Sequence, residues 1–104
     1  MDRRRQVVRL SIHDIPESLK NPQLFFNNET AELEIENLSP LGIGFAVAKS
    51  VLIMKGDFFY LKYISLHSDF KCLCVFVDED GESRHIGAYF ADPEDQKIML
   101  NYLL

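Results

Sequence analysis

Apolar and polar residues alternate along much of this chain, which is the period of β-strands with one buried face. The clearest case is residues 31–36, where Ala31, Leu33 and Ile35 alternate with three glutamates. The glutamates are expected to form a solvated face, because no metal-ligand spacing accompanies them. Alternation or β-prone composition predicts further strands at residues 8–13, 43–47, 51–54, 57–64, 70–77 and 84–90.

Turn-forming residues separate these segments at spacings typical of antiparallel hairpins. Residues 14–27 contain Pro16 and Pro22 and are interpreted as a loop with a short apolar piece at residues 24–26. The predicted turns lie at residues 27–28, 37–44, 55–56 and 78–81.

The period changes at the end of the chain, where a helix is predicted over residues 92–104. Asp92 is a suitable N-cap, Pro93 suits the first helical position, and acidic residues follow at the positive end of the helix dipole. Four residues at helical spacing form an apolar stripe that is expected to face the core: Ile98, Met99, Tyr102 and Leu103. Six or seven short strands followed by one helix predict an all-β fold, a small antiparallel β-barrel whose open side or end the helix covers. Closure of a barrel would also remove exposed strand edges.

Length and charge limit the possible functions. The 104 residues are expected to form one domain over residues 1–104. The formal net charge is −5, but without the four arginines of residues 3–9 the chain has 7 basic residues against 16 acidic ones, or −9. A general nucleic-acid binder needs a basic stripe or face, which this composition does not supply. Any attraction for anions is therefore expected to be local.

The sequence also predicts a soluble protein of the cytoplasm. The arginine-rich start resembles the basic region of a signal peptide, but Arg9, Ser11, His13 and Asp14 interrupt the run that follows. No stretch approaches the roughly 20 apolar residues that span a bilayer. The only cysteines, Cys72 and Cys74, are two residues apart in a predicted strand, a poor placement for a disulfide, so reduced thiols are expected.

Residues 3–9 hold the clearest candidate binding chemistry. The planar fork of arginine donors fits a phosphate or a guanine edge with two hydrogen bonds, and its flat face can stack on a purine. Two interpretations of this stretch remain open, a solvated basic tail and an anion-binding segment.

The arginine stretch and the second turn together resemble the paired signature of the PilZ domain family. That signature is an RxxxR motif, often preceded by another arginine, and a later [D/N]xSxxG motif; both are intact here, in residues 4–9 and 37–42. The series of strands and the terminal helix also follow that family. The resemblance implies a six-stranded antiparallel β-barrel that binds the bacterial second messenger cyclic di-GMP, with an N-terminal arginine arm (residues 1–9) folding over the nucleotide.

The resemblance also implies the site residues. Arg5 and Arg9 would be the paired arginines that contact guanine edges and phosphates, and Arg4 would add charge or stacking. Three residues of the turn would complete the ligand site: Asn37 and Ser39 by polar contacts with a guanine, and Gly42 by allowing a tight backbone path or a close approach of the ligand. Asn37 offers an amide where an aspartate would offer a carboxylate. The expected function is a cyclic di-GMP receptor whose arm orders on binding and alters a contact with an unidentified protein partner.

Three alternatives belong to other classes. The first is a PilZ-like adaptor that binds a protein without nucleotide. The second is a barrel that binds single-stranded nucleic acid through an aromatic platform at Phe58, Phe59, Tyr60 and Tyr63, although such a run is more often core. The third, an enzyme, is disfavoured because His13, His67 and His85 are scattered without a nucleophile-and-base or metal-ligand pattern. Neither a cofactor nor a metal site is expected, and the acidic turn at residues 78–81 lacks the ligand spacing of a calcium loop.

Overall fold

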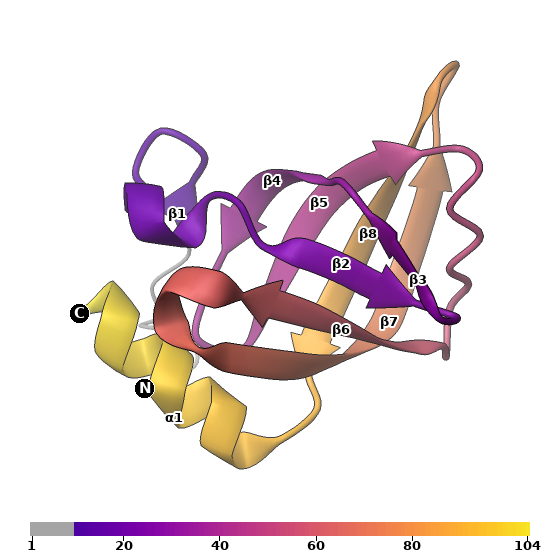
Figure 1. The fold of residues 1–104 in the computed structure, drawn as a ribbon. Helices are drawn as coiled ribbons and strands as arrows, with labels where there is room; N and C mark the ends of the chain where they lie inside the picture. Colours follow the sequence, from indigo (N-terminus) through magenta and orange to yellow (C-terminus); the bar gives the residue numbers. More distant parts are fainter. Residues whose placement is uncertain (1–9) are drawn as a thin grey trace, which may run out of the picture.

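The computed structural model describes residues 10–104, and these form one antiparallel sheet that curls into a half-barrel, with one helix (Figure 1). The order of the strands across the sheet is β1-β4-β5-β8-β7-β6-β2-β3. Their bounds are β1 Leu10–Ser11, β2 Gln23–Phe26, β3 Glu29–Ala31, β4 Glu34–Leu38, β5 Gly42–Ala48, β6 Phe58–Tyr63, β7 Ser68–Glu79 and β8 Ser83–Phe90. The predicted all-β class with a C-terminal helix is confirmed, but the sheet has eight strands where six were expected.

The sheet ends in two very short strands, so the expected closure is incomplete. β1 has 2 residues and β3 has 3, and they lie at the two ends of the strand order. Short edge strands expose few unpaired backbone groups, which limits pairing with other chains. The two ends of the sheet therefore offer little unpaired backbone to another chain.

Two sequence predictions fail around β2 and β3. Residues 24–26, expected to be part of a loop, belong to strand β2, which pairs with β6. The predicted strand at residues 31–36 is divided, because β3 ends at Ala31 and β4 begins at Glu34. The turn at Asn27 and Asn28 is confirmed: both have positive φ (55° and 65°), as a two-residue hairpin loop requires.

Residues 51–54 were predicted as a strand but pair with no other strand. They follow the end of β5, which lies between β4 and β8 and so has no free side. Ile53 is fully buried in the core, whereas Leu52 and Met54 on either side of it are exposed. The segment therefore adds Ile53 to the core, and Val51 packs against the core beside it.

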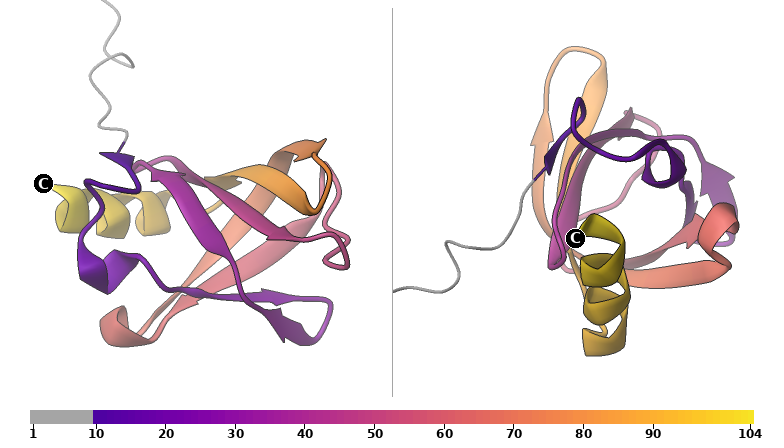
Figure 2. Two further views of the ribbon diagram at one scale, coloured as in Figure 1. Left: turned by 90° about the horizontal axis from the view of Figure 1, so that it is seen from above. Right: turned by 90° about the vertical axis from the view of Figure 1, so that its left-hand side faces the viewer.

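Figure 2 shows how the sheet curls around its concave side. The buried apolar side chains of the strands form one core cluster. Ring packing between Phe45 and Phe59, and between Tyr63 and Phe70, occupies its centre at centroid distances of 5.6 Å. The buried Tyr63 hydroxyl donates to the Leu19 carbonyl oxygen at 2.8 Å, which fixes the 3-10 helix Glu17–Leu19 (η2) over one end. A second 3-10 helix, Ile64–Leu66 (η3), follows β6.

Both cysteines lie in the core as free thiols, as predicted. Burial raises the pKa of the Cys72 thiol far above its ordinary value, and burial also raises that of Cys74. The neutral thiols act as small apolar residues of β7.

Helix α1 (Pro93–Leu103) packs against the sheet near the end of β8. The predicted N-cap is confirmed, since the Asp92 side chain accepts from the Glu94 amide at 2.9 Å. Met99 is fully buried, with Ile98 and Leu103 packed against the core. Tyr102 is 45% exposed, so its predicted place in the buried stripe is wrong.

Candidate functional site

The sequence-predicted site residues that the structure describes lie together. Asn37, Ser39 and Gly42 line a single hollow of about 390 Å³ on the outer face of the sheet, opposite the core. Arg4, Arg5 and Arg9 lie outside the described residues 10–104. Leu10, which follows Arg9 in the sequence, pairs with Leu38 of β4, directly beside Asn37. The described chain thus begins at the rim of the hollow.

Two glycines form the floor of this hollow. Gly44 of β5 and Gly87 of β8 are partners across the sheet, and they are flanked in register by Asn37 on β4 and Phe76 on β7. A Cβ atom at Gly44 would lie 2.8 Å from the Asn37 Nδ2 atom, and one at Gly87 would lie 3.3 Å from the Phe76 Cβ atom. The Asn37 side chain therefore occupies the space above Gly44, and Phe76 lies close beside Gly87.

Irregular pairing builds the two walls. The register shifts between Ile35 and Asn37 on β4, and between Cys74 and Phe76 on β7. Such a bulge adds one residue to a strand, so that two consecutive side chains point to the same face. Glu36 and Asn37 line the hollow on one side, and Val75 and Phe76 line it on the other.

Ser39 organises the turn between β4 and β5. Its hydroxyl oxygen accepts from the amides of Leu41 and Gly42, both at 3.2 Å, and its own amide donates to the Gly42 carbonyl oxygen at 2.9 Å. These contacts stabilise the tight turn that places Asn37 and Gly42 in the same hollow.

Gly42 is required by the packing of the sheet. A Cβ atom there would lie 2.2 Å from the Ala88 carbonyl oxygen of β8, which is a backbone atom. The close approach that was expected at Gly42 is therefore made by the neighbouring strand itself.

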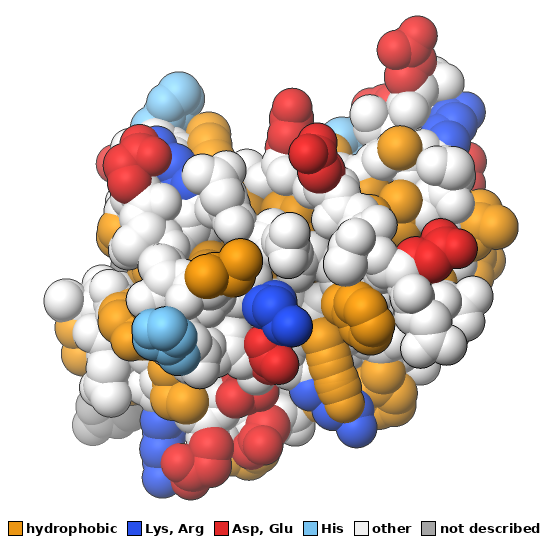
Figure 3. All heavy atoms as spheres, viewed as in Figure 1, with side chains coloured by type: hydrophobic (Ala, Val, Ile, Leu, Met, Phe, Trp, Pro, Cys, Tyr) orange, Lys and Arg blue, Asp and Glu red, His pale blue; other side chains and the backbone are white. Residues whose placement is uncertain are grey.

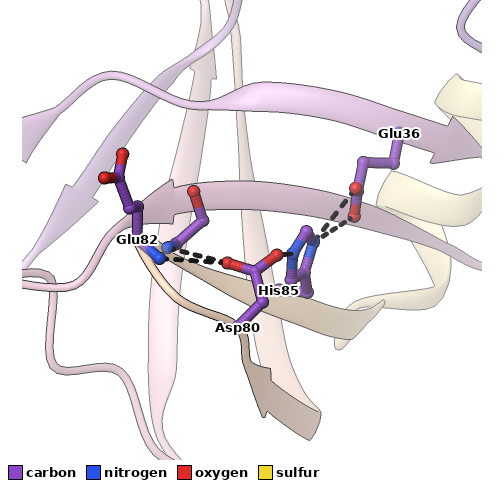
Figure 4. A network of polar contacts seen from close by, with 5 residues as sticks. Glu36, Asp80, Glu82 and His85 are labelled. Carbon is purple, nitrogen blue, oxygen red and sulfur yellow. Dashed lines mark hydrogen bonds and ion pairs between the residues drawn. The ribbon is translucent and has the colours of Figure 1, made fainter.

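A charged cluster forms one corner of the hollow (Figure 4). His85 of β8 lies between two carboxylates: its Nδ1 atom is 3.0 Å from an oxygen of Glu36, and its Nε2 atom is 2.7 Å from Asp80 Oδ2. Because both ring nitrogens face acceptors, the doubly protonated ring satisfies both contacts. The hydrogen bond to Asp80, followed by that to Glu36, raises the pKa of His85 to about 8.

The tip of the β7–β8 hairpin holds Asp80 in place. The Asp80 Oδ1 atom accepts from the amides of Glu82 and Ser83 at 3.2 and 3.0 Å. The hydrogen bond from His85 and then these amides lower the pKa of the Asp80 carboxyl. The acidic turn was predicted as a hairpin tip, and the structure confirms it.

Sequence reasoning missed Glu36 and His85. Glu36 was assigned to a solvated glutamate face, and His85 was counted among scattered histidines without a site pattern, yet both line the hollow. Glu34, two residues earlier on the same strand, does not line it. The alternation of residues 31–36 gave no sign of the bulge that contains Glu36.

The predicted aromatic platform is divided between the two faces of β6. Phe59 and Tyr63 are buried in the core, whereas Phe58 and Tyr60 are 52% and 39% exposed. Phe58 lines a second, larger hollow of about 810 Å³, which shares Leu41 and Tyr89 with the first. The Lys71 Nζ atom lies 4.5 Å above the Phe58 ring in this second hollow.

Charge on the described surface is scattered. In the view of Figure 3, carboxylates stand at the hairpin tip and near α1, and apolar side chains reach the surface between charged groups. Within residues 10–104, no three His, Cys, Asp or Glu side chains are arranged to hold a metal ion. No helix in this part of the chain is long and apolar enough to cross a membrane.

Comparison with known proteins finds similar structures but no similar sequence family. No family model matches the sequence, and no curated protein matches it significantly. Among solved structures, the PilZ domain of YcgR from Escherichia coli with c-di-GMP superposes with a TM-score of 0.66 at 17% identity, covering 96% of this chain and 88% of that one.

Two longer structures are also similar. The inhibitor of motility MotI/DgrA from Bacillus subtilis matches with a TM-score of 0.65 and 19% identity over 96% of this chain. YcgR from Escherichia coli in complex with c-di-GMP matches with a TM-score of 0.60 and 16% identity over 94% of this chain. The chain spans only 49% and 43% of their respective lengths. The fold expected from the two sequence motifs is therefore confirmed: residues 10–104 have a PilZ-like fold.

Proposed function

We propose that this protein is a receptor for cyclic di-GMP, with the outer-face hollow around Asn37 as its nucleotide site. The observation that carries the proposal is the convergence of Asn37, Ser39 and Gly42 on a hollow with a glycine floor. Gly44 and Gly87 add no side chains of their own to this floor, which leaves Asn37 as the polar group above Gly44. The volume of about 390 Å³ is in the range of small-molecule sites.

The arginines of residues 3–9 would balance the negative charge of the proposed ligand. Cyclic di-GMP carries two phosphodiesters, but none of the described residues that line the hollow is a lysine or an arginine. Arg4, Arg5 and Arg9 would supply the missing positive charge, and the described chain begins at the rim, where Leu10 pairs with Leu38. Their forked donors suit both phosphate oxygens and the guanine O6 and N7 atoms.

The output would be a changed contact with a protein partner. An arginine arm that orders over the nucleotide would cover the first hollow and create a new surface beside the second. That second hollow presents the aromatic side chains of Phe58 and Tyr89, and aromatic residues are enriched in protein interfaces. The similar structures support a binding or regulatory role, since two hold c-di-GMP and one is an inhibitor of motility.

Titration calorimetry with cyclic di-GMP tests the proposal. The wild-type chain is expected to bind with a Kd in the micromolar range or tighter, and more weakly at higher salt because charge pairs are screened. Each arginine contact is worth roughly 1.5–3 kcal/mol, so Arg5→Ala with Arg9→Ala is expected to weaken binding by at least a hundredfold. The stoichiometry distinguishes one bound nucleotide from two.

A matched control removes the same charge elsewhere. Arg3→Ala with Lys20→Ala changes the net charge equally but leaves the RxxxR motif intact, and it should bind nearly as the wild type does. Equal losses of affinity in the two double variants would mean that the arginines act only through their general charge. No heat and no competition from a folded wild-type sample would refute the receptor function and favour the adaptor, whose partner would then be sought through the second hollow.

A further inference from the structure

Two residues line both hollows, Leu41 and Tyr89. Leu41 belongs to the turn that Ser39 organises, and its carbonyl oxygen accepts from the Phe90 amide at 2.9 Å. Tyr89 directly precedes Phe90 on β8, so this backbone contact holds the two shared residues close together. The boundary between the hollows is therefore built by the turn of residues 37–42 and the end of β8.

The backbone of Tyr89 is fixed on both sides. Strand β8 lies between β5 and β7, and Tyr89 pairs with Gly42 of β5 and with Leu73 of β7. Its chain neighbours Ala88 and Phe90 are buried in the core. The Tyr89 side chain is 57% exposed, the largest fraction of any tyrosine or phenylalanine among residues 10–104. A change at this position is therefore a rotation of the side chain and not a movement of the strand.

The two neighbours of Tyr89 in the sheet differ. Gly42, on the side of the first hollow, has no side chain. Leu73, on the side of the second hollow, pairs in turn with Phe58 of β6, so this side carries a row of apolar side chains. Side chains on strands commonly adopt either of two χ1 rotamers. The Tyr89 ring can therefore lie over the first hollow or over the second.

A purine base in the first hollow would distinguish these two positions of the ring. Asn37 presents a polar group from the wall of β4, and Tyr89 presents an aromatic ring from β8. A base that meets the Asn37 amide with its polar edge has its flat face left for stacking, and every base stacks on aromatic side chains. Stacking is made only when the ring lies over the first hollow, so the bound base favours that position.

We propose, on the basis of the receptor function above, that Tyr89 stacks on one guanine of cyclic di-GMP and couples the two hollows. The bound base holds the ring over the first hollow and so uncovers the second, where Phe58 becomes accessible to the protein partner. Because coupling between two binding sites is reciprocal, a partner bound in the second hollow would strengthen nucleotide binding by the same factor.

Calorimetry with cyclic di-GMP tests the stacking contact. Tyr89→Ala is expected to weaken binding about fivefold to 150-fold, the range for the loss of one stack between a base and an aromatic ring. Tyr89→Phe keeps the ring and should bind nearly as the wild type does. Tyr89→Leu keeps only apolar bulk and should resemble the alanine variant. Tyr60→Ala is the matched control, because Tyr60 is 39% exposed but lines neither hollow.

Nuclear magnetic resonance of the full chain tests the coupling. Titration of the wild type with cyclic di-GMP should shift the backbone amide of Asn37 in the first hollow and those of Phe58 and Gln96 in the second, because a displaced aromatic ring changes the magnetic field at nearby nuclei. At saturating ligand, Tyr89→Ala should retain the shift in the first hollow and lose those in the second. Tyr60→Ala should retain both.

The outcomes separate the two proposals. Wild-type binding of cyclic di-GMP that Tyr89→Ala leaves unchanged would overturn the role of Tyr89 and leave the receptor function standing. Equal losses in Tyr89→Phe and Tyr89→Ala would also overturn it, because the ring would then not be the group that binds. Shifts in the second hollow that persist in saturated Tyr89→Ala would overturn the coupling. Failure of the wild type to bind cyclic di-GMP would overturn both proposals.

Discussion

Gly42 and Gly44 are two residues apart in the sequence, but their missing side chains serve different purposes. A side chain at Gly44 would collide with the Asn37 amide, whereas one at Gly42 would collide with the Ala88 carbonyl oxygen. Gly44 therefore leaves room for a polar side chain of the site. Gly42 leaves room for the neighbouring strand, and its effect on binding is expected to be indirect.

Replacement of Gly42 by alanine should destabilise the protein. Its Cβ atom would lie 2.2 Å from a backbone oxygen, so β5 and β8 would have to separate. Overpacking of this kind costs about 1–3 kcal/mol, and the upper end applies because the obstructing atom cannot rotate away. Urea denaturation of Gly42→Ala should show a lower midpoint.

Gly81→Ala is the control for Gly42, because nothing lies within 4 Å of the position its Cβ would take. Its free energy of unfolding should stay within roughly 0.5 kcal/mol of the wild type. An unchanged midpoint for Gly42→Ala would mean that the strands can move apart at no cost.

At the scale of elements, helix α1 attaches through fewer residues than its sequence pattern indicates. The predicted stripe had four members, of which Met99 alone is fully buried and Tyr102 is 45% exposed. Helical spacing defines which residues share a side of a helix but not how wide a stripe the sheet covers. Met99 should therefore dominate the packing energy of α1.

Met99→Ala and Tyr102→Ala make a matched pair in this helix. Truncation of the buried methionine should lower the free energy of unfolding by about 2–5 kcal/mol. Truncation of the exposed tyrosine should cost less than about 1 kcal/mol. Chemical denaturation followed by circular dichroism measures both, and comparable losses would contradict the observed orientation of the helix.

For some strands the hydrophobic pattern is sufficient to predict the strand from the sequence, and for others it is not. β4 to β8 were predicted because alternation and turn residues are local signals. Residues 51–54 carry a strand-like composition but have no free strand to pair with, which only the order of the sheet reveals. Strand β2 was hidden because Pro16 and Pro22 precede it and its apolar run is short.

Only part of the candidate site could be predicted from the sequence. The turn at residues 37–42 could be identified from its motif, and the structure places its three predicted residues in one hollow. The opposite wall, from Val75 and Phe76 of β7, had no signal, because a bulge is a property of the pairing between two strands. Partners that are distant in the sequence, such as Glu36 and His85, become visible only when β4, β5 and β8 are aligned.

For the molecule as a whole, the curled sheet separates stability from binding. The core occupies the concave side, and the hollow lies on the outer side of the same strands. Side chains such as Asn37 and Glu36 can therefore be replaced without opening the core. The cluster around His85 belongs to both, because His85 lines the hollow and also connects Glu36 of β4 to Asp80 at the hairpin tip.

The stability of the protein should depend on pH through this cluster. The pKa of His85 is about 8 in the folded protein against an ordinary 6.5, so its stabilising effect is complete below pH 6.5 and is lost as the pH rises through about 8. The pKa of Asp80 is lowered from 3.8, so its contribution is present above that pH and is lost on further acidification. Melting temperatures across the upper window should fall more for the wild type than for His85→Gln.

His13→Gln serves as the control for this experiment, because His13 is exposed and does not belong to the cluster of His85, Glu36 and Asp80. It should keep the pH profile of the wild type. A wild-type profile that is flat between pH 6.5 and about 8 would contradict the double carboxylate contact of His85.

The bulge in β4 also makes the length of that strand critical. Glu36 can be exchanged for another residue without moving its neighbours, but its deletion would turn the preceding or the following segment to the opposite face. Either Ile35 would leave the core or Asn37 would enter it. Substitution of residue 36 would therefore leave the course of β4 unchanged, whereas loss of this residue would disturb both the strand and the wall of the hollow.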